Sequence, residues 1–222
     1  FGPVGLSLYG GSIAIANLLQ RLQAQQISVD NADAIQDAIL KPLRAFVDVS
    51  SEDARLRWWR DQSLGLSGCG GILLALDLQG EQAMTTRLLA AALPRYIEAD
   101  QQLDVIGGCA GLIGSLLRLG TEPALQLALR AGDHLIATQN EDGAWSSSPS
   151  QPALLGFSHG TAGFTAALAR LHLLSADERY RTAAAAALAY ERARFCQDQG
   201  NWPDYRNGLS NTDSDQPNFM VS

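Results

Sequence analysis

Two residues with side chains suited to acid–base chemistry, a histidine and an aspartate, lie beside glycine-rich steps of the sequence. His159 lies in LLGFSHGTAGFTAAL, residues 154–168, and Asp104 begins DVIGGCAGLIGSLL, residues 104–117. Histidine changes its protonation state near neutral pH, and a carboxylate can orient the imidazole or transfer a proton itself. We therefore take His159 and Asp104 as a candidate acid–base pair.

Both residues also have a structural interpretation, which the sequence leaves open. Asp104 could cap the N-terminus of a helix, a position that aspartate favours, and His159 could bond only a backbone carbonyl. Ser158 is a candidate cap for the helix that follows it. The other histidines, His134 and His172, fall inside predicted helices, where we expect structural roles.

The elements that must position these residues form an internal repeat. Four stretches begin with small residues and continue into an apolar helix, at residues 8–22, 68–80, 108–120 and 160–172. We align them on Gly11, Gly71, Gly111 and Gly163. The last three copies read Gly-x-x-Gly, whereas the first has Leu8 in place of the first glycine. A second helical stretch follows each copy, roughly at 31–47, 81–98, 122–139 and 176–198.

Each repeat is thus a helical hairpin, and such a unit must stack on its neighbours to bury its apolar face. We predict an all-α fold, which is an α-solenoid or bundle in the simplest interpretation. The more specific prediction is an α/α toroid, a closed ring of hairpins. In a ring the glycine-rich ends of the inner helices converge, so His159 and Asp104 would both face its mouth.

Composition argues against several other classes of protein. The 222 residues carry a net charge of −7, which disfavours binding to nucleic acids and to anionic membranes. The sequence lacks a signal peptide and any apolar run of the roughly 18 residues needed to span a bilayer. Of the three cysteines, Cys69 and Cys109 occupy equivalent repeat positions, where we expect small buried residues, and Cys196 has no evident partner.

Two long polar loops, 141–156 and 199–218, are candidates for substrate contact, because long loops in helical domains are frequently functional. Their tryptophans, Trp145 and Trp202, could pack the loops down or line a peptide groove. Arg206 follows the Trp-Pro-Asp step. We take Trp202 and Arg206 as candidate substrate-binding residues.

Six motifs, in this order, resemble those of the lanthionine synthetase C-like cyclases. They are LYGGSIAIA (8–16), DVIGGCAGLIGSLL (104–117), GDHLIATQ (132–139), GFSHGTAGF (156–164), YERARF (190–195) and GNWPDYR (200–206). The resemblance is closest to the C-terminal cyclase domain of class II lanthipeptide synthetases, and it covers nearly the whole chain.

The resemblance implies an α/α toroid of seven hairpins with a zinc ion at its mouth. It implies addition of a peptide cysteine thiol to dehydroalanine or dehydrobutyrine, which closes a thioether ring. His159 matches the active-site histidine of the family and Asp104 its active-site aspartate. The implied partners are a precursor peptide, with leader and core, and an N-terminal dehydratase domain of the same synthetase. The implied location is a bacterial cytoplasm.

The sequence departs from the family pattern at the zinc ligands. In the family these come from a Trp-Cys-His-Gly step and a later Cys-His or Cys-Cys step, and none of the three cysteines matches them. The first step would follow the NFMVS region, beyond Ser222. We therefore expect residues 1–222 to be a partial cyclase domain with about four of seven hairpins, no zinc ligand and no activity alone.

Three alternatives remain at this stage. The first is a lanthionine synthetase C-like protein that binds a thiol peptide without cyclising it. The second is another α/α toroid enzyme, such as a glycosidase, which would need two carboxylates at the mouth, where only Asp104 stands out. The third is a truncated gene product without a function of its own.

Overall fold

The fold is all-α in the part of the chain that its structure describes, as predicted. The computed structural model describes residues 5–49, 51–89, 93–146, 152–206 and 219, so the two long loops are described only in part. Within these ranges the only extended pairings are isolated bridges, Cys196 with Asn201 and Pro203 with Phe219. The helices are α1 (Ser12–Ala24), α2 (Ala32–Val49), α3 (Glu52–Arg60), α4 (Cys69–Leu78), α5 (Gln82–Leu89), α6 (Leu93–Glu98), α7 (Cys109–Leu119), α8 (Glu122–Thr138), α9 (Thr161–Ser175) and α10 (Glu178–Ala193).

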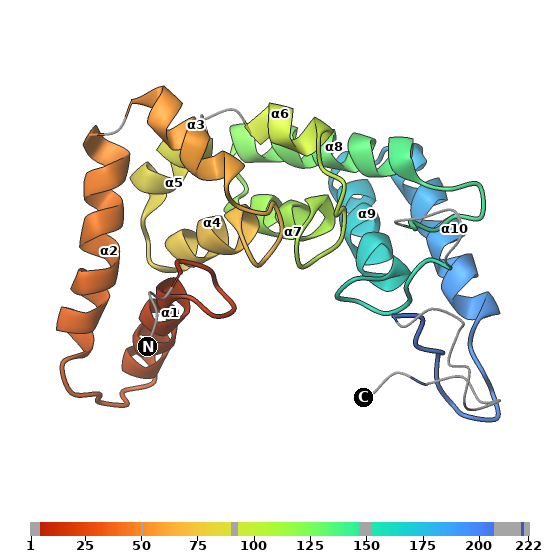
Figure 1. The fold of residues 1–222 in the computed structure, drawn as a ribbon, viewed down its shortest axis with the longest axis horizontal. Coiled ribbons are helices and arrows are strands. Elements are labelled where there is room, and N and C mark those ends of the chain that lie inside the picture. The colour runs from red at the N-terminus through yellow and green to blue at the C-terminus, as the bar shows by residue number, and fades with distance from the viewer. Residues whose placement is uncertain (1–4, 50, 90–92, 147–151, 207–218, 220–222) are drawn as a thin grey trace.

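The predicted hairpins are confirmed, and they are arranged as a segment of an α/α toroid. Helix α1 packs on α2, α4 on α5, α7 on α8 and α9 on α10. The first helices of the hairpins also contact one another in order, α1 with α4, α4 with α7 and α7 with α9. Figure 1 shows the resulting arch, with α4, α7 and α9 along its inner side and α6 and α8 along its outer side.

Two features of the outer layer differ from the sequence prediction. The stretch predicted as one helix over 81–98 forms two helices, α5 and α6, and Pro94 lies in the first turn of α6, where proline is well tolerated. The short helix α3 was not predicted. Its N-cap is Ser51, whose hydroxyl accepts a hydrogen bond from the Ala54 amide, and its buried Trp59 donates to the Leu88 carbonyl at 3.0 Å. That bond attaches α3 to α5.

The glycine steps exist because the loop before each inner helix closes directly over the helix. A Cβ at the anchoring glycines would come far closer to the loop backbone than the 3.0 Å that real contacts respect. The distances would be 2.0 Å from Leu66 O at Gly71, 1.9 Å from Val105 O at Gly111 and 2.1 Å from Phe157 O at Gly163. Only glycine permits this approach.

The structure corrects the alignment of the first repeat. Helix α1 begins at Ser12 and its N-cap is Gly11, so Gly11 stands where Gly68, Gly108 and Gly160 stand in the other copies. The sequence alignment instead matches Gly11 to the second glycine of the step. The physical reason is that the 5–11 loop closes on the helix at its N-cap, where a Cβ on Gly11 would lie 2.2 Å from the Ser7 nitrogen.

One hydrophobic cluster runs along the arch from Ile13 in α1 to Ala187 in α10. A second, smaller cluster contains Ala153, Leu155 and Tyr190, with Trp202 packed against it. It joins the loop before α9 to the C-terminal part of α10. Among the described helices, none combines the length and the apolar character needed to cross a membrane.

The close approach at Gly111 predicts opposite effects for two glycine substitutions in one helix. Gly111→Ala forces a Cβ against a backbone oxygen, and we expect a loss of roughly 1–3 kcal/mol in the free energy of unfolding. Gly114→Ala meets only Arg170 Nη1, at 3.8 Å, so the higher helix propensity of alanine should stabilise the protein by about 0.5–1 kcal/mol. Urea unfolding of both variants measures the difference. Equal stability would contradict the packing described here.

Candidate active site

His159 and Asp104 lie in direct contact, although they are 55 residues apart in the chain. His159 Nδ1 is 2.7 Å from Asp104 Oδ2. The carboxylate is mostly covered, with 16% of the side chain exposed, whereas the imidazole is 50% exposed. Because a carboxylate only accepts hydrogen bonds, it favours the tautomer with a proton on Nδ1. That tautomer leaves the Nε2 lone pair available to a substrate.

Asp104 is fixed by the turn before α7. Its Oδ1 accepts the Gly107 amide at 2.6 Å, and its backbone carbonyl accepts the Gly108 amide at 3.0 Å. The helix cap that we considered for Asp104 is supplied by another residue, because Asp100 Oδ2 accepts the Cys109 amide in the first turn of α7, at 2.7 Å. The carboxylate of Asp104 is therefore free to face the imidazole.

The loop that carries His159 lies against the loop that carries Asp104. The Val105 amide donates to the Ser158 carbonyl at 3.2 Å, which joins the two loops beside the side-chain contact. The expectation that Ser158 caps α9 is wrong. The N-cap of α9 is Gly160, which has no side chain to accept a hydrogen bond.

Sequence reasoning missed Glu191, a carboxylate that lies under the His159 loop. Glu191 is only 5% exposed, and its Oε1 accepts the amides of Gly156 and Ala162, both at 2.9 Å. Burial raises its pKa above the usual carboxyl value, against the two amides and Arg194, which lower it. A signal was present in the sequence, because Glu191 lies four residues after Ala187, on the buried face of α10.

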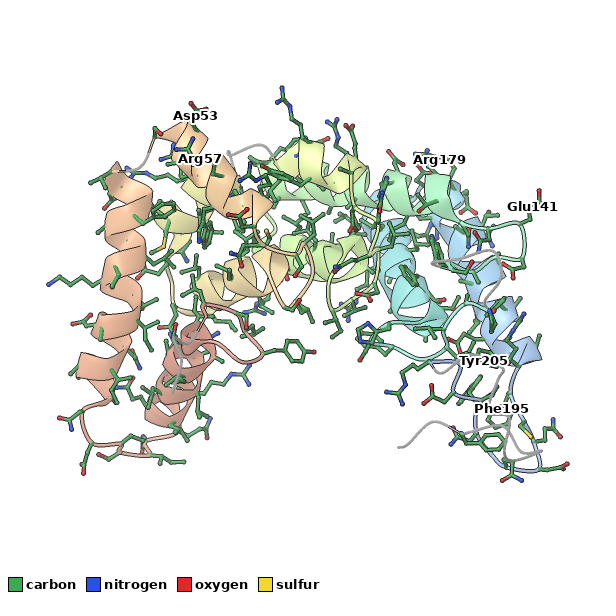
Figure 2. All side chains as sticks on the ribbon, viewed as in Figure 1. Asp53, Arg57, Glu141, Arg179, Phe195 and Tyr205 are labelled. Carbon is green, nitrogen blue, oxygen red and sulfur yellow. The ribbon has the colours of Figure 1, made fainter. Side chains whose placement is uncertain are left out.

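Two cavities flank the imidazole. The larger, about 340 Å³, is lined by both members of the pair and by Trp145, Tyr205 and Arg206. The smaller, about 220 Å³, also contacts His159 and Arg206. His159 therefore lines both cavities, and Arg206 lines both with it. Figure 2 shows Tyr205 near the lower end of α10, on the side where the arch opens.

Arg206 lines both cavities but already has a partner. Its Nε lies 2.9 Å from both carboxylate oxygens of Asp204, and this hydrogen bonding holds the pKa of Asp204 below its usual value. The ion pair of Arg206 and Asp204 therefore places a hydrogen-bonding guanidinium near His159, and Asp204 offsets its charge. Contact between Arg206 and a substrate stays a prediction.

The two tryptophans of the long loops have packing roles. Trp202 donates its indole N–H to the Glu191 carbonyl at 2.9 Å. Its ring packs edge-on against the Phe195 ring, with 4.6 Å between the ring centroids. It lines neither cavity beside His159, so its contact with substrate also stays a prediction. Trp145 stacks on Phe164, with 4.4 Å between the ring centroids, and lines the larger cavity.

A sequence model of the family described as lanthionine synthetase C-like protein matches residues 2–217. The chain belongs to the lanthionine synthetase C-like family. The match spans almost the entire sequence and includes the loops of His159 and Asp104. No curated protein matches the chain at a significant level.

Zinc, which the family resemblance implies, does not fit the described residues of this lanthionine synthetase C-like chain. Among them, no three His, Cys, Asp or Glu side chains come together to hold a metal ion. Cys69 and Cys109 are buried, and burial raises the pKa of both thiols far above the ordinary range. His134 and His172 bond backbone carbonyls, those of Asp100 and Asp177. We therefore derive no step through a metal.

The buried carboxylate predicts how stability responds to pH. Because the folded-state pKa of Glu191 is raised, its contribution to stability is complete below the unfolded-state pKa, at about 4.3, and is lost as pH rises through the folded-state pKa. Glu191→Gln does not titrate. We expect the stability of the wild type relative to this variant to fall as pH rises above about 4 in urea unfolding.

A matched carboxylate provides the control with the opposite sign. Hydrogen bonds from Arg179 hold the pKa of Asp177 below its usual value, so its contribution is present at neutral pH and is lost as pH falls through the folded-state pKa. Wild type relative to Asp177→Asn should therefore gain stability as pH rises. The same sign for both variants would contradict the burial of Glu191.

Proposed function

We propose that this chain supplies the acid–base pair for lanthionine formation. The reaction adds a peptide cysteine thiol to the β-carbon of dehydroalanine or dehydrobutyrine and closes a thioether ring. The observation that carries the proposal is the 2.7 Å contact between His159 and Asp104, beside a cavity, in a chain of the lanthionine synthetase C-like family.

The chemistry needs one proton to move, and the geometry supports His159 as its carrier. The thiol loses its proton, the sulfur forms a bond to the β-carbon, and the π electrons shift to form an enolate, which is then protonated at the α-carbon. Nothing else enters or leaves. His159 Nε2 can take a proton at the first step or return one at the last.

Asp104 acts through the imidazole in this proposal. Its carboxylate holds the proton on Nδ1 and stabilises the imidazolium that forms while Nε2 carries the transferred proton. The same arrangement of histidine and carboxylate serves this purpose in hydrolases of unrelated fold. Because the carboxylate is itself held by the Gly107 amide, the imidazole is oriented before substrate binds.

The size and lining of the larger cavity beside His159 are consistent with binding part of a peptide substrate. Its volume, about 340 Å³, is within the range of pockets that hold small organic groups, and aromatic side chains line it beside Arg206. The substrate proposed is a dehydrated precursor peptide, so a dehydratase must act first. The dehydratase domain and the class II relationship belong to this proposal. So does a cytoplasmic location, where thiols stay reduced.

The test is ring closure on a synthetic peptide that contains one dehydroalanine and one cysteine. It uses the protein as its complete gene encodes it, with Zn²⁺ supplied. The measured quantity is the loss of alkylatable thiol without a change in peptide mass. We expect His159→Asn to lower the rate by about 10²–10⁴-fold, the usual contribution of a general acid–base. Asp104→Asn should lower it less.

His172→Asn is the matched control, since it removes a histidine of α9 that lines neither cavity beside His159 and contacts only the Asp177 carbonyl and Glu178, at the start of α10. It should keep the wild-type rate. A wild-type rate in His159→Asn would overturn the assignment of the pair. Tight binding of the peptide by the wild type without ring closure would overturn catalysis and favour a binding protein.

A further inference from the structure

We propose that Glu191 of α10 is a positioning residue, which holds the His159 loop so that the imidazole meets Asp104. The inference rests on the proposed function of His159, because it gives a reason for Glu191 to be buried under that loop. No part of the acid–base assignment itself uses Glu191.

The two hydrogen bonds of Glu191 involve amides that are equally far from His159 in the sequence, one before it and one after it. Gly156 lies three residues before His159, and Ala162 lies three residues after it. A single oxygen, Glu191 Oε1, accepts both amides, each at 2.9 Å. One atom on a neighbouring helix thus fixes both ends of the seven-residue segment that presents the histidine.

This carboxylate substitutes for a missing helix cap. The first amides of a helix need acceptors, and the N-cap of α9 is a glycine without a side chain. Ala162 is in the first turn of α9, so its amide is one of these donors. Gly156 has a φ of +85°, in the left-handed region that glycine adopts readily, and its amide donates to the same oxygen of Glu191.

The position of Glu191 is itself fixed on both sides. Its backbone carbonyl accepts the Trp202 indole N–H at 2.9 Å. The preceding residue, Tyr190, donates its hydroxyl to the Ala153 carbonyl at 3.3 Å, at the start of the loop. The loop itself is exposed to solvent just after Gly156, where the Phe157 side chain is 55% exposed.

Besides the Val105–Ser158 hydrogen bond that joins the two loops, each acid–base partner has an anchor of its own. The turn before α7 holds Asp104 through the Gly107 amide, and α10 holds His159 through Glu191. Loss of the Glu191 acceptor leaves two amides without a partner, and the loop must move to expose them to water. The imidazole then leaves the carboxylate, even though neither residue has changed.

The experiment reads the His159 ring directly, with nitrogen-15 NMR of histidine-labelled protein. The ring nitrogen shifts report which nitrogen is protonated. Wild type should show one tautomer, with the proton on Nδ1. Glu191→Gln keeps an acceptor oxygen and should retain this signature. Glu191→Ala removes the acceptor oxygen, so the His159 ring should lose its contact with Asp104. We therefore expect nitrogen shifts averaged over both tautomers, as in Asp104→Asn.

Tyr180→Phe is the matched control, because it removes a buried hydroxyl from the other end of the same helix. That hydroxyl donates to the Leu129 carbonyl and to Asp133, both at 3.0 Å. Figure 2 shows Arg179, the residue before Tyr180, at the upper end of α10, and Phe195 just beyond the lower end of this helix. The control should lower stability and leave the His159 signature unchanged.

Glu191→Asp is the second variant, to be used where Glu191→Ala does not fold. It keeps the charge but withdraws the oxygen by one methylene, so it should also give averaged shifts. Where ring closure is measurable, its kcat should fall by up to about 10²-fold with little change in KM, the effect of a misplaced catalytic group.

A folded Glu191→Ala or Glu191→Asp protein with the wild-type His159 signature would overturn the proposal. The same change of signature in Tyr180→Phe would also overturn it, because loss of stability alone would then be sufficient. The NMR result does not depend on turnover. Failure of the cyclisation assay therefore tests the proposed function separately.

Discussion

The structure depends on one repeated contact, in which the backbone of a loop closes over a glycine in the first turn of an inner helix. At Gly71, Gly111 and Gly163 a Cβ would lie about 2 Å from a backbone oxygen, so no other residue permits the closure. Once the loop is folded down, its backbone groups find partners at the start of the helix. The apolar residues that follow then pack on the neighbouring hairpin, and successive hairpins form the arch.

The same contact decides where chemistry can be placed. Residues just before the anchoring glycines lie at the same end of adjacent inner helices. A side chain at this place in one repeat can therefore contact a side chain at this place in the next repeat. Asp104 and His159 are such a pair, and the amide of Val105 joins their two loops. Asp104 lies seven residues before Gly111 and His159 four before Gly163. In the repeat of α4 the same positions hold Leu64 and Ser67, so that glycine step closes without an aspartate or a histidine.

Glycine at the helix start creates a second requirement, since it cannot cap the amides it exposes. In α7 the acceptor is Asp100 from the preceding turn, and in α9 it is Glu191 from α10. Because Asp100 and Glu191 accept these amides, Asp104 Oδ2 and the His159 ring are not needed as helix caps. The acid–base pair can therefore face the cavity between the loops.

The sequence by itself determined the helical hairpins, their order and the two candidate catalytic residues, because helical periodicity and glycine steps are local signals. Only the tertiary structure decided that Asp104 meets His159, that Gly11 is an N-cap and that Glu191 supports the loop. It also separated α5 from α6. These features depend on how neighbouring helices are rotated and spaced, and hydrogen bonds near 2.9 Å are set by that packing, which no short stretch of sequence encodes.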